Sequence, residues 1–203
     1  MNGVISLPTP YKFMSEKKRE PVKSDHDISV ALMYRIAAGD SSALQELIHK
    51  WKMPIINFIY RSIGNFEDAE EIALKTFTNL YNNAGNYEPT AKFSTYLFLI
   101  AKRLMISEIR KQKSRKLCIL PPEELQSIHY QNYKEDLKNE IEEVFLKALQ
   151  KIPEKYRMTL ILIIQEEMSY PDAAEILEIT EGNLRTQLHR GRKLLKLEMD
   201  NIL

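Results

Sequence analysis

The sequence predicts an all-α protein made of two small helical domains joined by a flexible linker, and three observations lead to this prediction. Apolar residues recur at helical spacing through most of the chain, and no stretch has the pattern of a strand. The pattern fails between residues 117 and 135, where Pro121 and Pro122 interrupt it. Beyond that break, a short apolar helix, a tight corner and a second amphipathic helix follow in the order of a helix-turn-helix.

Composition and length bound the class of protein. Of the 203 residues, 44% are hydrophobic and 28% charged, which is enough for one large or two small globular domains. The single cysteine, Cys118, cannot form an internal disulfide and has no partner at metal-ligand spacing. The chain has no 18-residue apolar run and no signal-peptide pattern, so we expect no membrane insertion and a cytoplasmic location.

The formal net charge of +1 conceals two blocks of opposite sign. Residues 102–116 hold seven basic side chains and one acid, Glu108, whereas residues 123–143 hold seven acids and two lysines. The basic block predicts a surface that faces a polyanion. The acidic block indicates a neighbouring segment that avoids or imitates one.

These patterns divide the chain into four parts. We expect a mobile N-terminal arm over residues 1–25, a first domain over residues 26–116, a linker over residues 117–135 and a second domain over residues 136–203. The arm is assigned because it contains three prolines and no periodicity.

The first domain begins with two predicted helices, over residues 28–38 and 41–63. The second is capped by Ser or Asp at its start, is closed by Gly64, and contains Pro54, which predicts a kink. A third helix is predicted over residues 66–81, and its acidic first turns suit the positive end of the helix dipole. Its expected apolar stripe is Ala69, Ile72, Ala73, Phe77, Leu80 and Tyr81.

A fourth helix, predicted over residues 92–116, changes character along its length. Its first half is apolar and aromatic, with Phe93, Tyr96 and Leu97, and its second half is the basic block. Aromatic rings beside basic side chains are typical of a site for single-stranded nucleic acid, because bases stack on the rings and phosphates pair with the cations. The alternative is that Phe93, Leu97 and Ile100 are ordinary core residues, which we expect of at least these three.

In the second domain, helices are predicted over residues 136–150, 154–166, 171–177 and 181–200, with Thr180 as the N-cap of the last. That last helix has an inward stripe of Leu184, Leu188, Gly191 and Leu195. Its opposite side carries Thr186, His189, Arg190 and Lys193, flanked by Asn183 and Arg185. Such a face can contact phosphates and base edges in a major groove, whereas the alternative is a solvated basic face.

Motifs of enzymatic chemistry are missing from the sequence. It has no Gly-rich phosphate-binding loop, no nucleophile elbow and no zinc-protease motif, and its four histidines are dispersed. We therefore expect no catalytic residues, no metal ion, no cofactor and no enzymatic activity.

With both domains considered, the chain resembles a bacterial RNA polymerase sigma factor of the extracytoplasmic-function (ECF) group. Residues 68–81 and 93–110 are similar to sigma region 2, and residues 152–157, 169–170 and 188–193 are similar to sigma region 4. The order and spacing of the two matches are more specific than either alone.

The resemblance implies a protein that binds core RNA polymerase at the β′ clamp helices and the β flap, and that directs it to promoter DNA. It also implies an anti-sigma factor as partner and a monomer when free. By position, the polymerase-binding residues are Asp68 and Glu71. The −10 DNA-binding residues are Asn86, Tyr87, Tyr96, Lys102, Arg103, Arg110 and Lys111, and the −35 residues are Asn183, Arg185, Thr186, His189, Arg190 and Lys193.

The chain departs from the family pattern at a few positions, and two other functions remain open. Leu74 and Lys75 stand where the family usually has Gln and Glu, Tyr96 stands for Trp, and Arg103 for Asn. One alternative is a stand-alone helix-turn-helix regulator with a helical sensor domain, which would normally dimerise. The other is a protein-binding adaptor whose basic faces are only solvated.

Overall fold

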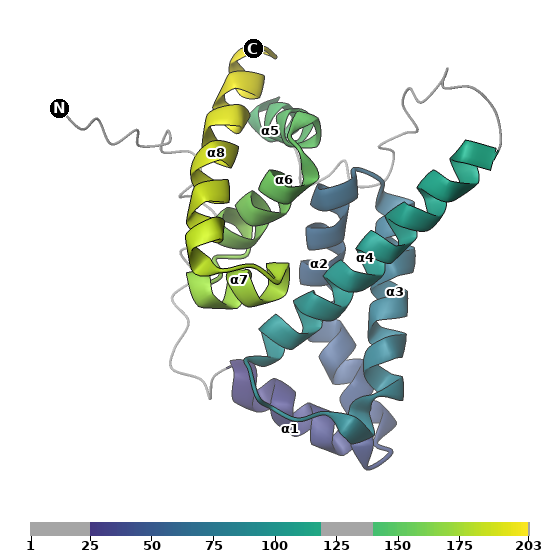
Figure 1. The fold of residues 1–203 in the computed structure, drawn as a ribbon. Helices are drawn as coiled ribbons and strands as arrows, with labels where there is room; N and C mark the ends of the chain where they lie inside the picture. Colours follow the sequence, from purple (N-terminus) through teal and green to yellow (C-terminus); the bar gives the residue numbers. More distant parts are fainter. Residues whose placement is uncertain (1–24, 119–139, 203) are drawn as a thin grey trace.

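The computed structural model describes residues 25–118 and 140–202, and within these ranges the chain is helical, with no strand. The N-terminal bundle consists of α1 (Asp25–Ala37), α2 (Ser41–Ile63), α3 (Phe66–Asn82), the short 3-10 helix η2 (Ala84–Asn86) and α4 (Phe93–Cys118). The C-terminal domain consists of α5 (Glu140–Lys151), α6 (Glu154–Leu160), the π-helical turn η3 (Ile161–Gln165), α7 (Tyr170–Leu177) and α8 (Glu181–Asp200). The C-terminal domain lies against one side of the bundle (Figure 1).

Helix α2 begins and ends where its sequence signals predict. The Asp40 carboxylate accepts hydrogen bonds from the amides of Ser42 (2.9 Å) and Ala43 (3.3 Å), which satisfies two of the free donors of the first turn. Hydrogen bonds from Ser42 and from Arg35 of α1 lower the pKa of Asp40 to about 2. At the other end, Gly64 adopts φ 81°, a left-handed conformation that a residue without a Cβ reaches at little cost.

Aromatic side chains hold the bundle together at the crossing of α2 and α4. The Trp51 ring lies 5.6 Å from Phe93 and 6.5 Å from Phe98, and Phe98 lies 5.1 Å from Phe58. The Trp51 indole also donates to the hydroxyl of Ser29 at 3.1 Å. Each ring contact adds to the free energy gained by burial, so this cluster fixes the position of α4.

The predicted apolar stripe of α3 is confirmed at five of its six positions. Ala69, Ile72, Ala73, Phe77 and Leu80 are buried. Tyr81 is 51% exposed, so its assignment to the core is wrong, because it lies in the last turn of α3, where the helix reaches the edge of the bundle. In α4, Phe93 and Leu97 are fully buried as expected, whereas Ile100 is only partly buried.

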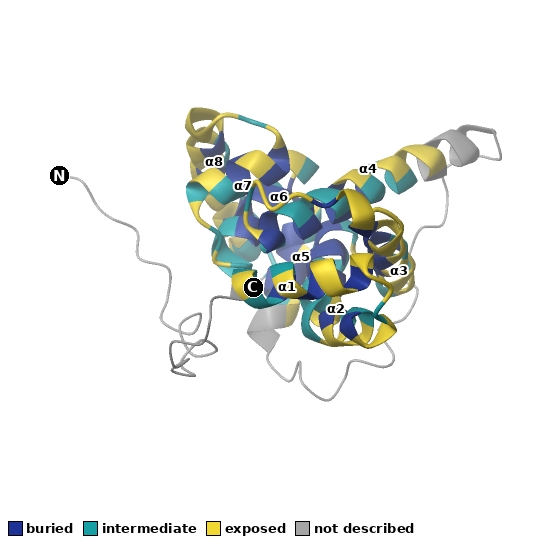
Figure 2. Cartoon of the chain, turned by 90° about the horizontal axis from the view of Figure 1, so that it is seen from below, coloured by how far each residue is buried: buried dark blue, intermediate teal, exposed yellow. Residues whose placement is uncertain are grey.

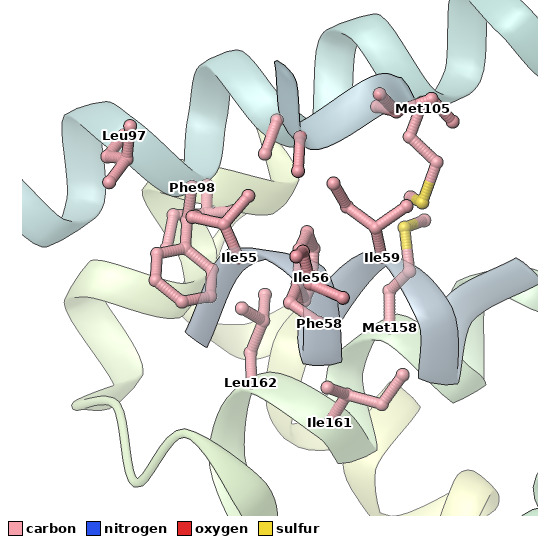
Figure 3. Close-up of a cluster of buried hydrophobic side chains, with 14 of the residues drawn as sticks. Ile55, Ile56, Phe58, Ile59, Leu97, Phe98, Met105, Met158, Ile161 and Leu162 are labelled. Carbon is pink, nitrogen blue, oxygen red and sulfur yellow. The ribbon is translucent and has the colours of Figure 1, made fainter. Parts of the chain in front are cut away.

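The two domains share one hydrophobic core. The cluster drawn in Figure 3 contains Ile55, Phe58 and Ile59 of α2 together with Met158, Ile161 and Leu162 of the C-terminal domain. Buried residues gather between the two groups of helices, and exposed residues lie on their outer sides (Figure 2). The C-terminal domain is therefore packed onto the bundle through α2 as well as through α4.

Several predicted boundaries differ from the observed ones, including the start of α1, which was expected at residue 28 and lies at Asp25. The helix expected over residues 154–166 becomes a π-helical turn at Ile161–Gln165, in which the Glu166 amide donates to the carbonyl of Ile161 at 3.0 Å. This wider turn has both Ile161 and Leu162 fully buried. Helix α4 continues through Cys118, and the rest of the predicted linker, like the predicted arm before Asp25, lies outside the described residues.

Candidate nucleic-acid interface

Helices α7 and α8 form the predicted helix-turn-helix. Ser169 caps α7 by accepting from the Asp172 amide at 3.3 Å, and Thr180 caps α8 by accepting from the Asn183 amide at 3.3 Å. Between them, Glu178 adopts the left-handed conformation, with φ 57° and ψ 43°. The Ile179 amide then donates back to the carbonyl of Ala174 at 3.0 Å, which ends α7 and turns the chain sharply.

The inward face of α8 matches the predicted stripe. Leu184, Leu188, Gly191 and Leu195 are all buried. A Cβ at Gly191 would lie 3.2 Å from Cγ of Leu160, so the absence of a side chain lets α8 approach α6 closely. The packing of this stripe fixes which side of α8 faces outward.

The outer face of α8 is exposed at all six positions that the sequence assigned to it. Arg185 lies 3.4 Å from Glu181 and 5.6 Å above the ring of Tyr170, so its guanidinium is partly oriented. A hydrogen bond with Arg190 is the main cause that lowers the pKa of Tyr156. We call the set of exposed residues the α8 outer face: Asn183, Arg185, Thr186, His189, Arg190 and Lys193.

A second basic surface lies along α4. Arg103, Arg110 and Lys111 are exposed, whereas Lys102 is buried, with 6% of its surface accessible. Together with Ile106, Ser107 and Glu178 these residues line an open groove of about 700 Å³, which we call the basic groove. The structure thus brings four of the seven predicted −10 residues to one place.

The aromatic members of the predicted −10 set lie apart from that groove. Tyr87 is 8% exposed, and its ring lies 5.0 Å from Tyr96 and 6.2 Å from Phe93. Burial raises the pKa of the Tyr87 hydroxyl to about 12 and also raises that of Tyr96. Of the two rings, only the half-buried Tyr96 reaches the surface, while Asn86 is exposed beside them.

The predicted polymerase-binding acids lie on α3, outside the residues that line the basic groove. Asp68 is half-buried in the first turn, and Glu71 is exposed and pairs with Lys75 at 2.7 Å. Lys75 also reaches Glu108 of α4 at 3.3 Å, which lowers the pKa of that carboxyl. Leu74, beside them, is 68% exposed, so this side of α3 presents an apolar side chain among charges.

Sequence reasoning missed two carboxylates that the fold brings to α4. Glu178 lies 2.6 Å from Lys102 and 2.6 Å from Arg103, and Asp172 lies 2.7 Å from Lys92. The partners are 75 to 80 residues apart, so no local pattern reports the contact. The one available signal was a Glu at a helix end, in a position that usually takes Gly or Asn.

The described residues offer neither a membrane span nor a metal site. None of these helices is long and apolar enough to cross a membrane. In the same part of the chain, no three His, Cys, Asp or Glu side chains come together in a way that could hold a metal ion.

Comparison with known families gives two matches along the chain. Residues 47–115 match the family described as Sigma-70 region 2, and residues 142–195 match Sigma-70, region 4. The two matches contain every residue of the predicted DNA-binding and polymerase-binding sets.

Individual relatives match most of the chain. It is 29% identical over 188 residues to the ECF RNA polymerase sigma factor SigW of Bacillus subtilis, which covers 83% of this chain and 95% of that protein. It is 25% identical over 181 residues to the RNA polymerase sigma-H factor of Pseudomonas aeruginosa, covering 85% of this chain and 94% of that protein.

Two solved structures share the fold. CnrH in complex with the cytosolic domain of CnrY aligns with a TM-score of 0.62 at 19% identity, over 86% of this chain and 99% of that one. The sigma factor RpoE of Bartonella quintana, in complex with the anti-sigma factor NepR, aligns with a TM-score of 0.64 at 22% identity, over 77% of this chain and 96% of that one.

Proposed function

The chain belongs to the ECF sigma factors of bacterial RNA polymerase, and on that premise we propose which of its surfaces bind DNA and which bind the polymerase. As a sigma factor, it binds core RNA polymerase and directs transcription initiation at promoters. The stand-alone regulator is not favoured, because both sigma regions match in order along one chain.

The −35 element is read by the α8 outer face. The observation that supports this proposal most is that all six polar residues of that face are exposed while the opposite stripe is buried. A recognition helix needs this division, since it must pack on its own domain and still present donors to base edges. Arg185 and Arg190 supply guanidinium groups suited to guanine, and the other members contact either bases or phosphates.

The −10 element is bound along α4. Arg103, Arg110 and Lys111 in the basic groove are suited to pair with phosphates of the opened strand, and the edge of Tyr96 to stack with a base. Tyr87 is buried against the ring of Tyr96, so it positions that ring and does not itself meet DNA.

The polymerase is bound through α3, where Asp68 and Glu71 meet the β′ clamp helices, while the C-terminal domain meets the β flap. Leu74, exposed one turn after Glu71, adds apolar area to the clamp contact. Because polymerase acts on the chromosome, the protein works in the cytoplasm. Two solved structures of similar fold contain partners named CnrY and the anti-sigma factor NepR, so we include an anti-sigma factor among the partners.

Run-off transcription tests the proposal. Core polymerase is programmed with fragments of the source genome, with and without this protein. We expect new transcripts with discrete start sites only when the protein is present, and a shared −35 and −10 sequence upstream of them. The absence of any protein-dependent transcript, despite measurable binding to core polymerase, would refute the proposal.

A further inference from the structure

The helix-turn-helix of this chain lies on its own basic groove. Helix α7 packs beside the first half of α4 (Figure 1), and the corner that follows α7 reaches the groove. We propose that this contact is an autoinhibitory lock, in which Glu178 occupies the cations that would otherwise bind DNA phosphates. The inference rests on the role proposed above for the basic groove in −10 binding.

The Glu178 carboxylate uses both of its oxygens on α4. One oxygen lies 2.6 Å from Nζ of Lys102 and the other 2.6 Å from Nη2 of Arg103. A carboxylate with one cation on each oxygen presents a charge and geometry close to those of a phosphate diester. A DNA phosphate that binds both cations together must therefore displace Glu178, although Arg103 is 61% exposed and keeps other N–H donors.

A second carboxylate fastens the other end of the contact. Asp172 of α7 accepts from Nζ of Lys92 at 2.7 Å and from the hydroxyl of Thr95 at 3.4 Å, in addition to the Ser169 hydroxyl beside it. Burial opposes ionisation of Asp172, but the hydrogen bonds from Lys92 and Ser169 outweigh it and lower its pKa. The two acids thus hold α7 to α4 at two points, near the start of α4 and near its middle.

The backbone at Glu178 supports a role for its side chain. The left-handed region is less favourable for a residue with a Cβ than for glycine, and Gly or Asn is usual at this position of a helix end. Glu gains nothing locally from this conformation. The carboxylate that it brings to Lys102 and Arg103 gives a physical reason for a Glu to stand there.

The lock affects one DNA-binding surface and leaves the other open. Lys102 is buried beneath the corner and Arg103 is engaged, whereas all six residues of the α8 outer face remain exposed. The free protein therefore presents its −35 face and withholds part of its −10 groove. Promoter opening then requires the two domains to separate, and binding to core polymerase at both domains supplies that separation.

The turn at Glu178 also provides a clean variant. Asn tolerates the left-handed conformation better than Glu does, and its short neutral side chain cannot bridge the two cations. Glu178→Asn should therefore remove the lock while keeping the helix-turn-helix folded, which a thermal melt verifies. The matched control is Glu175→Gln, which neutralises an exposed acid one turn earlier in α7.

The first measurement is the separation of the domains. Fluorophores are attached at Asn79→Cys and Lys196→Cys, both exposed, in a Cys118→Ser background, and energy transfer is recorded without DNA or polymerase. We expect the parent and Glu175→Gln to show the short distance, and Glu178→Asn to populate longer ones. Identical distance distributions in all three proteins would overturn the inference.

The second measurement is the affinity for a fluorescein-labelled single-stranded DNA 12-mer of random sequence. Glu178→Asn is expected to bind about 3- to 10-fold more tightly than the parent, because it loses two ion pairs that compete with DNA phosphates, one to the buried Lys102 and one to the exposed Arg103. If the domains separate but this affinity stays unchanged, the contact does not cover a DNA-binding surface and the inference fails. Run-off transcription by the parent with core polymerase tests the proposed function separately, because it does not depend on how the free protein closes.

Discussion

The guanidinium of Arg157, in α6, donates a 2.6 Å hydrogen bond to the carbonyl oxygen of Ser62, in the last turn of α2. The same side chain donates to the Gln150 side chain (2.5 Å) and to the carbonyls of Gln150 (2.8 Å) and Ile152 (2.9 Å). One residue thus supplies partners for free carbonyls at the end of a helix in the other domain and at the α5–α6 turn. Beside it, Nε2 of Gln150 donates to the carbonyl of Arg61 at 2.8 Å.

We expect Arg157→Met to destabilise the protein by about 2–4 kcal/mol, because it leaves several buried carbonyls without their charged donor. Methionine preserves most of the volume of the stem, so the loss reports the hydrogen bonds and not a cavity. Urea unfolding monitored by circular dichroism measures the change. Arg192→Met, on the exposed side of α8, is the control and should shift stability by less than about 0.5 kcal/mol. Equal stability of the two variants would contradict this role.

Replacing Arg190 with Ala should weaken −35 recognition by about 1–3 kcal/mol if the guanidinium reads a base edge. Thr186→Ala should have a smaller effect of the same kind. The measurement is transcription by the holoenzyme from a promoter library randomised at −35. If the variant loses its preference at one base pair of the −35 element, Arg190 contacts that base. If transcript yield falls equally for all −35 sequences, Arg190 contacts a phosphate. An unchanged preference and yield would remove Arg190 from the −35 set.

The double variant Asp68→Ala with Glu71→Ala should bind core polymerase more weakly while its helix content stays the same. An acid near the start of a helix stabilises that helix by only about 0.3–1 kcal/mol, so α3 should remain folded in the double variant. Glu46→Ala is a suitable control, since Glu46 is also exposed and also has one ion pair, with Arg35 at 3.3 Å. Loss of circular dichroism in place of loss of binding would show that the acids serve only the helix.

Glu166 predicts a pH dependence of stability. It lies with Lys50, Lys92, Glu167 and Asp172 around an interdomain cavity of about 590 Å³. Burial raises its pKa to about 7, although the charge of Arg61 acts in the opposite sense. The folded state therefore holds a proton that the unfolded state releases near pH 4.5, so stability falls as pH rises from about 4.5 to 7 and then levels.

The expected size of this effect is about 3–4 kcal/mol, because the pKa rises from 4.5 to about 7 and each pKa unit corresponds to about 1.4 kcal/mol. Glu166→Gln should lack that part of the decline and exceed the parent in stability at about pH 8, as measured by urea unfolding between about pH 4.5 and 8. Glu167→Gln, at the exposed neighbouring position, should keep the parental profile. Parallel profiles for the parent and Glu166→Gln would show that Glu166 is ionised throughout.

The features that the sequence predicted well are those set by local chemistry. The bounds of α2 follow from Asp40 and Gly64, and the buried stripe of α8 follows from the angular spacing of Leu184, Leu188 and Leu195. Because helical spacing alone divides α8 into two faces, the residues assigned to −35 DNA follow from the same pattern.

The features that could not be predicted from the sequence depend on contacts between elements that are distant along the chain. The burial of Tyr87 arises because η2 packs against α1, and nothing near residue 87 in the sequence shows this. Likewise, Lys102 and Arg103 were assigned to the −10 DNA-binding set, and the sequence near them does not show that Glu178, far along the chain, pairs with both. Ion pairs across a domain interface leave no periodic pattern in either partner.

The core shared by Ile55, Ile59, Met158 and Ile161 has a consequence for synthesis on the ribosome (Figure 3). The N-terminal bundle is complete once α4 has emerged, but α6 and η3, which cover α2, follow only after roughly 45 more residues, which takes about 2–9 s at usual translation rates. During that interval the α2 face that receives α6 is bare on a nascent chain. The bundle must therefore fold as a unit that tolerates an open apolar side. Ribosome-associated chaperones should crosslink to the side of α2 that receives α6 in chains arrested after α4, and lose that contact once α6 emerges.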